Sequence, residues 1–173
     1  MLTTIFTPFP YLETERLSLW QMELSDAPDI LALRSDARVN QYIDRKPTTS
    51  IEEAETFIKR INTAIERGES LFWAVADRQT NKFLGTLCLW NIDHERDKVE
   101  LGYELIYEAQ GKGYMLEAVP KVIDFAWQRM GAKEMEAVIV EGNERSVKLI
   151  DRLGFTLRNK EDNIMYYTLQ RPV

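Results

Sequence analysis

The amino-acid sequence predicts a mixed α/β fold, in which one sheet contains both antiparallel and parallel strand pairs. The first indication is a run of three apolar segments, 71–76, 83–92 and 99–106, separated only by the polar turns DRQTNK and DHERDK. This pattern predicts an antiparallel three-strand meander. The second indication is a helical segment between 99–106 and the apolar segment 135–140. A helix between two strands predicts a β–α–β crossover, and therefore a parallel pair.

One strand and two helices are predicted before the meander. Residues 13–22 alternate between apolar and polar side chains around Leu17 and Leu19, which indicates a strand. A first helix is expected over about 25–35, because its first residues are good N-caps. A second helix opens with Ser50 and Glu53, which are spaced as in a capping box, and ends at Gly68.

Two helices, one strand and a closing hairpin are predicted after the meander. A glycine-containing loop leads into a helix over about 112–130. Residues 143–153 form a second predicted helix, which Gly154 ends. The segments 155–158 and 164–169 flank the polar turn NKEDN and indicate a hairpin.

Composition restricts the class of protein. A chain of 173 residues with 45% hydrophobic residues can bury one full core, so we take 1–173 as a single domain. The net charge of −6 argues against a nucleic-acid partner. With one cysteine no internal disulfide can form, and with one histidine no zinc site or other metal is expected. Because there is no signal peptide and no membrane-length apolar run, we expect a soluble cytoplasmic protein with no membrane partner.

The stretch YEAQGKGYMLEA, residues 107–118, has the features of a phosphate-binding loop. A helix N-terminus offers unpaired N–H groups and a partial positive charge, and glycines let the backbone approach an anion. Gly111 and Gly113 supply that freedom, and Lys112 adds a charge. The Walker pattern is absent, and Leu116 stands where a dinucleotide motif requires a third glycine. The alternative is a tight strand–helix turn that binds no ligand.

With this loop the chain resembles the GNAT family of acetyl-CoA-dependent N-acetyltransferases, which carries Q/R-x-x-G-x-G/A between its fourth strand and third helix. The segment Gln110–Met115 follows that motif, except that methionine replaces the final Gly or Ala. A second family motif, N-x-x-S/A-x-x-L/F followed by GF, is matched from Asn143 to Phe155. LETERLSL and VELGYEL resemble the RimJ/RimL branch, named for enzymes that acetylate ribosomal-protein N-termini. The resemblance covers residues 13–169.

This resemblance implies a GNAT fold with a central, largely antiparallel sheet, flanking helices and a splayed pair of fourth and fifth strands, here 99–106 and 135–140. The co-substrate it implies is acetyl-CoA. The backbone of Leu105 and Ile106 would pair with the pantetheine arm, which Asn143 would also bind. The residues expected to bind the pyrophosphate are Gln110, Gly111, Lys112, Gly113, Tyr114, Met115 and Leu116.

Acetyl transfer to an amine needs a base, a polarised carbonyl and a stabilised leaving thiolate. Glu100 and Glu104 share one face of their strand, so each is a candidate base, and the alternative is that they face solvent or pair with Arg or Lys. The family's usual acid, a tyrosine, is replaced by Ile150. By resemblance, Ser146 would instead face the thioester sulfur and bind the departing thiolate. A backbone N–H near Leu105 would meet the oxyanion.

The resemblance to the RimJ/RimL branch implies that the acceptor is a protein N-terminal α-amine, for example that of a ribosomal protein, attacking directly in a ternary complex. Two alternatives stay open: a small-molecule amine such as a polyamine, amino sugar or drug, and a non-catalytic acyl-CoA-binding module. Segments 36–50 and 92–98 are expected to shape the acceptor site. An exposed strand edge or the closing hairpin would suit a homodimer.

Overall fold

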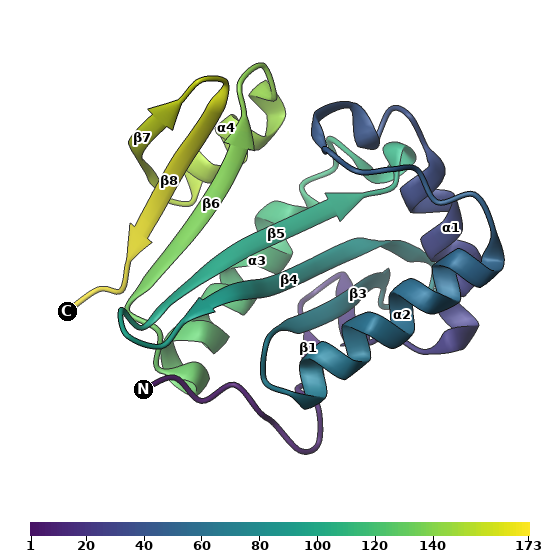
Figure 1. The fold of residues 1–173 in the computed structure, drawn as a ribbon, viewed down its shortest axis with the longest axis horizontal. Coiled ribbons are helices and arrows are strands. Elements are labelled where there is room, and N and C mark those ends of the chain that lie inside the picture. Colours follow the sequence, from purple (N-terminus) through teal and green to yellow (C-terminus); the bar gives the residue numbers. More distant parts are fainter.

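Eight strands form one mixed sheet in the order β1-β2-β3-β4-β5-β6-β8-β7 in the computed structural model, which describes residues 1–173 (Figure 1). The strands are β1 (Leu12–Glu13), β2 (Leu17–Gln21), β3 (Leu71–Asp77), β4 (Phe83–Asp93), β5 (Lys98–Leu105), β6 (Glu134–Val140), β7 (Thr156–Glu161) and β8 (Ile164–Gln170). The helices are α1 (Ala27–Ser35), α2 (Ile51–Glu66), α3 (Tyr114–Phe125) and α4 (Glu144–Arg152). This order confirms the predicted mixed α/β fold, including the β3–β4–β5 meander. No helix is long and apolar enough to cross a membrane.

The predicted single strand over 13–22 is wrong in one respect, because the segment contains two strands. Glu13 belongs to β1, which folds back on β2 so that Leu12 lies opposite Leu19. The turn between them is closed by the Thr14 N–H, which donates to the Leu17 carbonyl at 2.9 Å. The alternation is confined to the residues around Leu17 and Leu19, so it does not reveal a turn in the polar residues before them.

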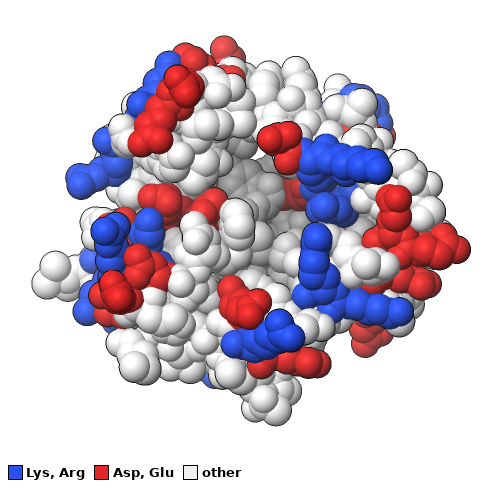
Figure 2. Space-filling view, viewed as in Figure 1, with Lys and Arg blue, Asp and Glu red and all other residues white.

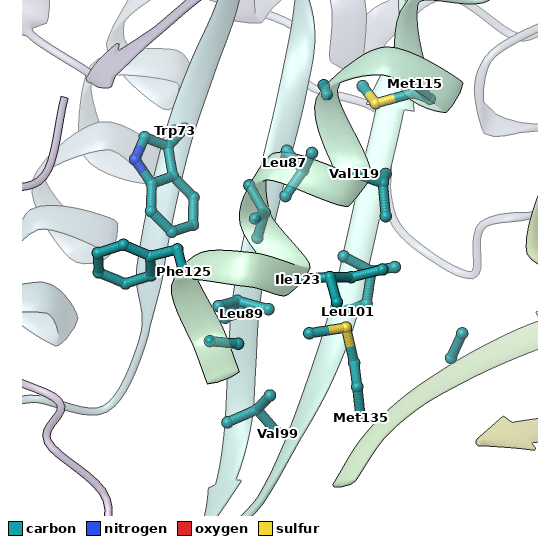
Figure 3. Close-up of a cluster of buried hydrophobic side chains, with 14 of the residues drawn as sticks. Trp73, Leu87, Leu89, Val99, Leu101, Met115, Val119, Ile123, Phe125 and Met135 are labelled. Carbon is teal, nitrogen blue, oxygen red and sulfur yellow. The ribbon is translucent and has the colours of Figure 1, made fainter. Parts of the chain in front are cut away.

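The sheet separates two apolar cores. Trp73 and Val75 of β3 are fully buried on the face that α3 covers, whereas Ala74 is buried on the face that α1 and α2 cover. Successive side chains of a strand point to opposite faces, so one strand contributes to both cores. Figure 3 shows the larger core, where the strand side chains meet Val119 and Ile123 of α3.

The starts of α2 and α3 differ slightly from the predicted ones. The Ser50 hydroxyl oxygen caps α2 by accepting from the Glu53 N–H at 3.1 Å, as predicted. The reciprocal bond is shifted by one residue, because the Glu53 carboxylate accepts from the Thr49 N–H at 2.8 Å. α3 begins at Tyr114 rather than at residue 112, because Gly113 has φ of 79°, which an α-helix cannot contain. A π-helical turn then carries the helix on to Met130, as predicted.

The one parallel pair, β5 and β6, holds together at only one end. Residues Lys98–Leu101 pair with Glu134–Ala137, and beyond them the two strands have no paired residues. β6 instead stays paired with β8 up to Val140. The sheet therefore opens between the second halves of β5 and β6 (Figure 1), as the predicted splayed pair requires.

Candidate active site

A cleft of about 820 Å³ lies where β5 and β6 diverge. Four segments line it: the end of β5, the glycine loop with the start of α3, one side of α4 with the two residues before it, and residues 38–43 between α1 and α2. Figure 2 shows a hollow in the middle of this face, with acidic and basic side chains at its margins. Most of the predicted site residues line this cleft, and Glu100, Ile106 and Lys112 do not.

The glycine loop has the open backbone that an anion-binding turn requires. Gly111 has φ of 74°, and a Cβ built there would meet no atom within 4 Å. The Met115 side chain is 5% exposed and packs in the core (Figure 3), so it does not fill the loop. The Lys112 side chain is exposed, and the Lys112 backbone carbonyl accepts a hydrogen bond from Arg16 Nη1 at 3.1 Å. Lys112 therefore contributes a backbone position rather than a charge inside the cleft.

Cations from other segments gather beside the loop. Arg145, Lys148 and Arg152 of α4 line the cleft, as does Arg38. The Arg145 Nη1 donates to Gln110 Oε1 at 2.6 Å, which joins α4 to the loop. These side chains give the loop end of the cleft a positive field, which suits a phosphorylated ligand.

The end of β5 offers fewer free backbone groups than predicted. The Ile106 N–H donates to the Leu84 carbonyl at 2.8 Å, and the Ile106 carbonyl accepts from the Ala109 N–H at 3.0 Å. The Ile106 N–H is therefore already used within the sheet, whereas its carbonyl has a second lone pair that can accept one further bond. Leu105, one residue earlier, turns its backbone toward the opening because strand bonding alternates sides. Its carbonyl accepts from Gln110 Nε2 at 3.2 Å.

Asn143 and Ser146 lie together at the start of α4, inside the cleft. The Asn143 Oδ1 accepts from the Ser146 N–H at 3.3 Å and caps the helix. This bond leaves the amide N–H₂ group of Asn143 as its donor to a ligand. The Ser146 hydroxyl is half-buried at the first turn of a helix, where a developing negative charge is stabilised.

The two candidate bases differ in their surroundings. Glu104 lines the cleft and forms an ion pair with Arg45, with Nη1 to Oε2 at 2.7 Å. Pairing with Arg or Lys is the alternative to a role as base for this residue. Glu100 lies on the same face four residues earlier, about 13 Å away along the strand. The two carboxylates therefore cannot act on the same atom.

Glu100 is held in a buried, partly acidic environment. It is 8% exposed, and its Oε2 accepts from Asn91 Nδ2 at 2.9 Å. Burial raises the pKa of Glu100 above its ordinary value and the neighbouring Glu136 adds to the rise, whereas the Asn91 bond and Lys98 oppose it. A carboxylate with a raised pKa is a stronger base, which is the property that amine deprotonation needs.

The structure adds three residues that the sequence did not reveal. Arg45 binds Glu104, and Asn91 binds Glu100. The buried Tyr103 hydroxyl lies in the cleft wall. Asn91 gave one usable signal: it stands in a strand although asparagine disfavours strands. It has φ of 46°, and the β4–β5 register shifts between Trp90 and Asp93.

Comparison with known proteins agrees with this geometry. Residues 16–156 match the model of the acetyltransferase (GNAT) domain. The uncharacterized N-acetyltransferase p20 of Bacillus licheniformis is 34% identical over 144 residues, which cover 83% of this chain and 81% of that protein.

Solved structures share the fold at low sequence identity. The ribosomal-protein-S5-alanine acetyltransferase from Vibrio fischeri superposes with a TM-score of 0.82 at 21% identity, covering 93% of this chain and 96% of that one. The spermidine N-acetyltransferase from Vibrio cholerae, solved with CoA and spermine, gives 0.78 at 19% identity, covering 90% and 95%. The family match spans more than half of the chain and includes the glycine loop and the start of α4. This chain therefore belongs to the GNAT family of acetyltransferases.

Proposed function

We propose that this protein transfers the acetyl group of acetyl-CoA to a primary amine by direct attack in a ternary complex. The observation that carries the proposal is the cleft between the diverging ends of β5 and β6, bordered by the open glycine loop. Such a cleft can hold an extended arm beside a strand edge while the loop binds its phosphates.

The cleft residues fit acetyl-CoA at both of its ends. The backbone of the loop from Gln110 to Leu116 and the cations of α4 would bind the pyrophosphate. Leu105 and Asn143 would hold the pantetheine arm, with Ser146 facing the thioester. The Leu105 N–H would donate to the oxyanion as the amine attacks.

We assign the base to Glu100, acting through water, and the binding of the acceptor cation to Glu104. Glu100 has the raised pKa of a base and lies buried beyond the cleft, on the same face of β5 as Glu104. Glu104 lies in the cleft wall, where its ion pair with Arg45 keeps it in place. An ammonium group reaching the cleft would meet Glu104 first, and a chain of several water molecules along the face of β5 would carry its proton to Glu100.

For the acceptor, we propose a protein N-terminal α-amine, supported by the likeness to the Vibrio fischeri ribosomal-protein acetyltransferase. A polyamine is the second candidate. It is favoured by three carboxylates on one face of the sheet, Glu100, Glu104 and Glu136, and by the likeness to the spermidine enzyme. Multiple spaced carboxylates suit a ligand with several cationic centres.

The test is CoA release from acetyl-CoA with peptides that begin with Ala, Ser or Met, and with spermidine and an aminoglycoside. We expect release with a peptide, at least tenfold slower in Glu100→Gln and in Ser146→Ala. Glu104→Gln should mainly raise the KM of the acceptor. Glu141→Gln, an exposed carboxylate outside the cleft, is the matched control. Acetyl-CoA binding without release in any reaction would contradict the proposal and favour a non-catalytic binding module.

A further inference from the structure

Tyr103 carries a buried polar group that nothing in the chain satisfies. Its hydroxyl oxygen is buried and has no hydrogen-bond partner. Buried hydroxyl groups are normally paired, so an orphan in a cleft wall points to a ligand or reacting atom as its partner. The aromatic ring packs against the larger core, which fixes the direction of the hydroxyl.

The position of Tyr103 places this hydroxyl on the α4 side of the cleft. Tyr103 lies between Gly102 and Glu104 on β5, so its side chain points to the opposite face from Glu100 and Glu104. On that face, Ser146 of α4 also lines the cleft. The Ser146 hydroxyl is near enough to lower the pKa of Tyr103, although the two hydroxyl groups do not form a hydrogen bond in this structure.

The site also lacks a proton donor on α4. Ile150, whose side chain is fully buried in the core, stands where the family's tyrosine would be. Ser146 can donate one hydrogen bond to a thiolate, but a serine hydroxyl is a far weaker acid than a phenol and is therefore the poorer proton donor. A second donor is therefore needed if the thiolate is to leave as a thiol.

We propose that Tyr103 is the general acid that protonates the departing sulfur, an inference that rests on the acetyl transfer proposed above. As the C–S bond breaks, its electron pair stays on sulfur and the proton passes from the Tyr103 Oη to that sulfur. The phenolate that results regains a proton, by way of cleft water, from the protonated nitrogen of the newly formed amide, which leaves as a neutral amide. Ser146 supplies the second hydrogen bond to the sulfur.

The surroundings of Tyr103 keep its hydroxyl protonated. Burial raises the pKa of Tyr103 to about 12, and the Ser146 hydroxyl opposes that rise. The phenol is therefore protonated at the start of every turnover.

The decisive variant is Tyr103→Phe, which removes one oxygen and keeps the ring. We expect kcat to fall at least tenfold, within the range typical of a lost general acid, while the KM values of both substrates change less than twofold. The dissociation constant of acetyl-CoA should also change less than twofold. Because the hydroxyl has no partner in the free protein, the urea midpoint of the free protein should stay unchanged or rise.

Tyr167→Phe is the matched control, because Tyr167 is also a buried strand tyrosine but does not line the cleft. Its kcat should equal that of the wild type. An unchanged kcat in Tyr103→Phe would overturn the proposal, and so would a loss of kcat accompanied by an equal loss of acetyl-CoA affinity or by a lower urea midpoint. Failure of the wild type to release CoA would instead contradict the proposed function.

Discussion

Arg45 binds the Glu104 carboxylate through both of its oxygens. Its Nη1 lies 3.0 Å from Oε1 and 2.7 Å from Oε2, and the two side chains are only 12% and 14% exposed. The same guanidinium donates to Asn40 Oδ1 from Nε at 2.9 Å. The connection between α1 and α2 is thus fastened to β5 at the margin of the cleft, and the pair both shapes the acceptor side and holds Glu104.

Arg45→Ala should destabilise the protein by about 2 kcal/mol, because it leaves the partly buried Glu104 without its partner. Urea unfolding at neutral pH would measure this loss. The matched control is Arg78→Ala, whose pair with Glu13 is 47% and 42% exposed. Exposed pairs contribute less than about 1 kcal/mol. If both variants lose the same free energy of unfolding, the Arg45–Glu104 pair stabilises the protein no more than an exposed pair does.

Glu100→Gln should show a pH-dependent effect on stability. Burial raises the folded-state pKa of Glu100 above its ordinary value of 4.5, so the folded protein binds this proton more tightly than the unfolded chain. Ionised Glu100 therefore lowers stability as the pH rises above about 4.5. The free energy of unfolding of the variant, relative to wild type, should increase from pH 4 to pH 8. Glu15→Gln, at an exposed position, should show a smaller change with pH.

The order of the elements could be predicted from the sequence because its signals are local. Turn residues, helix caps and the glycines that end helices lie within a few positions of the element they bound. The turn between β1 and β2 could not be predicted, because it lies in the polar residues just before Leu17 and contains no glycine or proline. The capping pattern located the start of α2 but not the true partner of Glu53, since a long side chain reaches either neighbouring N–H.

The site could be predicted only where its residues follow one another in the chain. The segment Gln110–Leu116 and the start of α4 carry motifs, and both line the cleft. Arg45 meets Glu104 across 59 positions, and no local pattern records such a contact. The use of the Ile106 N–H within the sheet could not be predicted either, because the backbone bonding of a strand depends on its register, which fixes which residues face a neighbour.

Asn91 should act as a positioning residue for Glu100. Its backbone is left-handed, with φ of 46°, and its amide donates to the Glu100 carboxylate. Asn91→Gly keeps the backbone and removes the amide, so the pKa of Glu100 should rise further and the acidic limb of the kcat profile should move to higher pH. Asn91→Ala should show the same shift and also lose about 1 kcal/mol of stability from backbone strain. If the pH profile of kcat does not move in either variant, Asn91 does not influence the base.

Gly111 and Gly131 allow a test of the loop that separates binding from strain. They have φ of 74° and 81°, and a Cβ added at either would meet no atom within 4 Å. Gly111→Ala and Gly131→Ala should therefore lose similar stability, about 1 kcal/mol each. Only Gly111→Ala adds a methyl group where the pyrophosphate is expected. The dissociation constant of CoA from this variant should therefore rise at least tenfold. Gly131, at the end of the π-helical turn, lies outside the cleft and should leave CoA binding unchanged. Calorimetric titration of both variants with CoA would decide the matter, and equal affinities would place the phosphates elsewhere than at this loop.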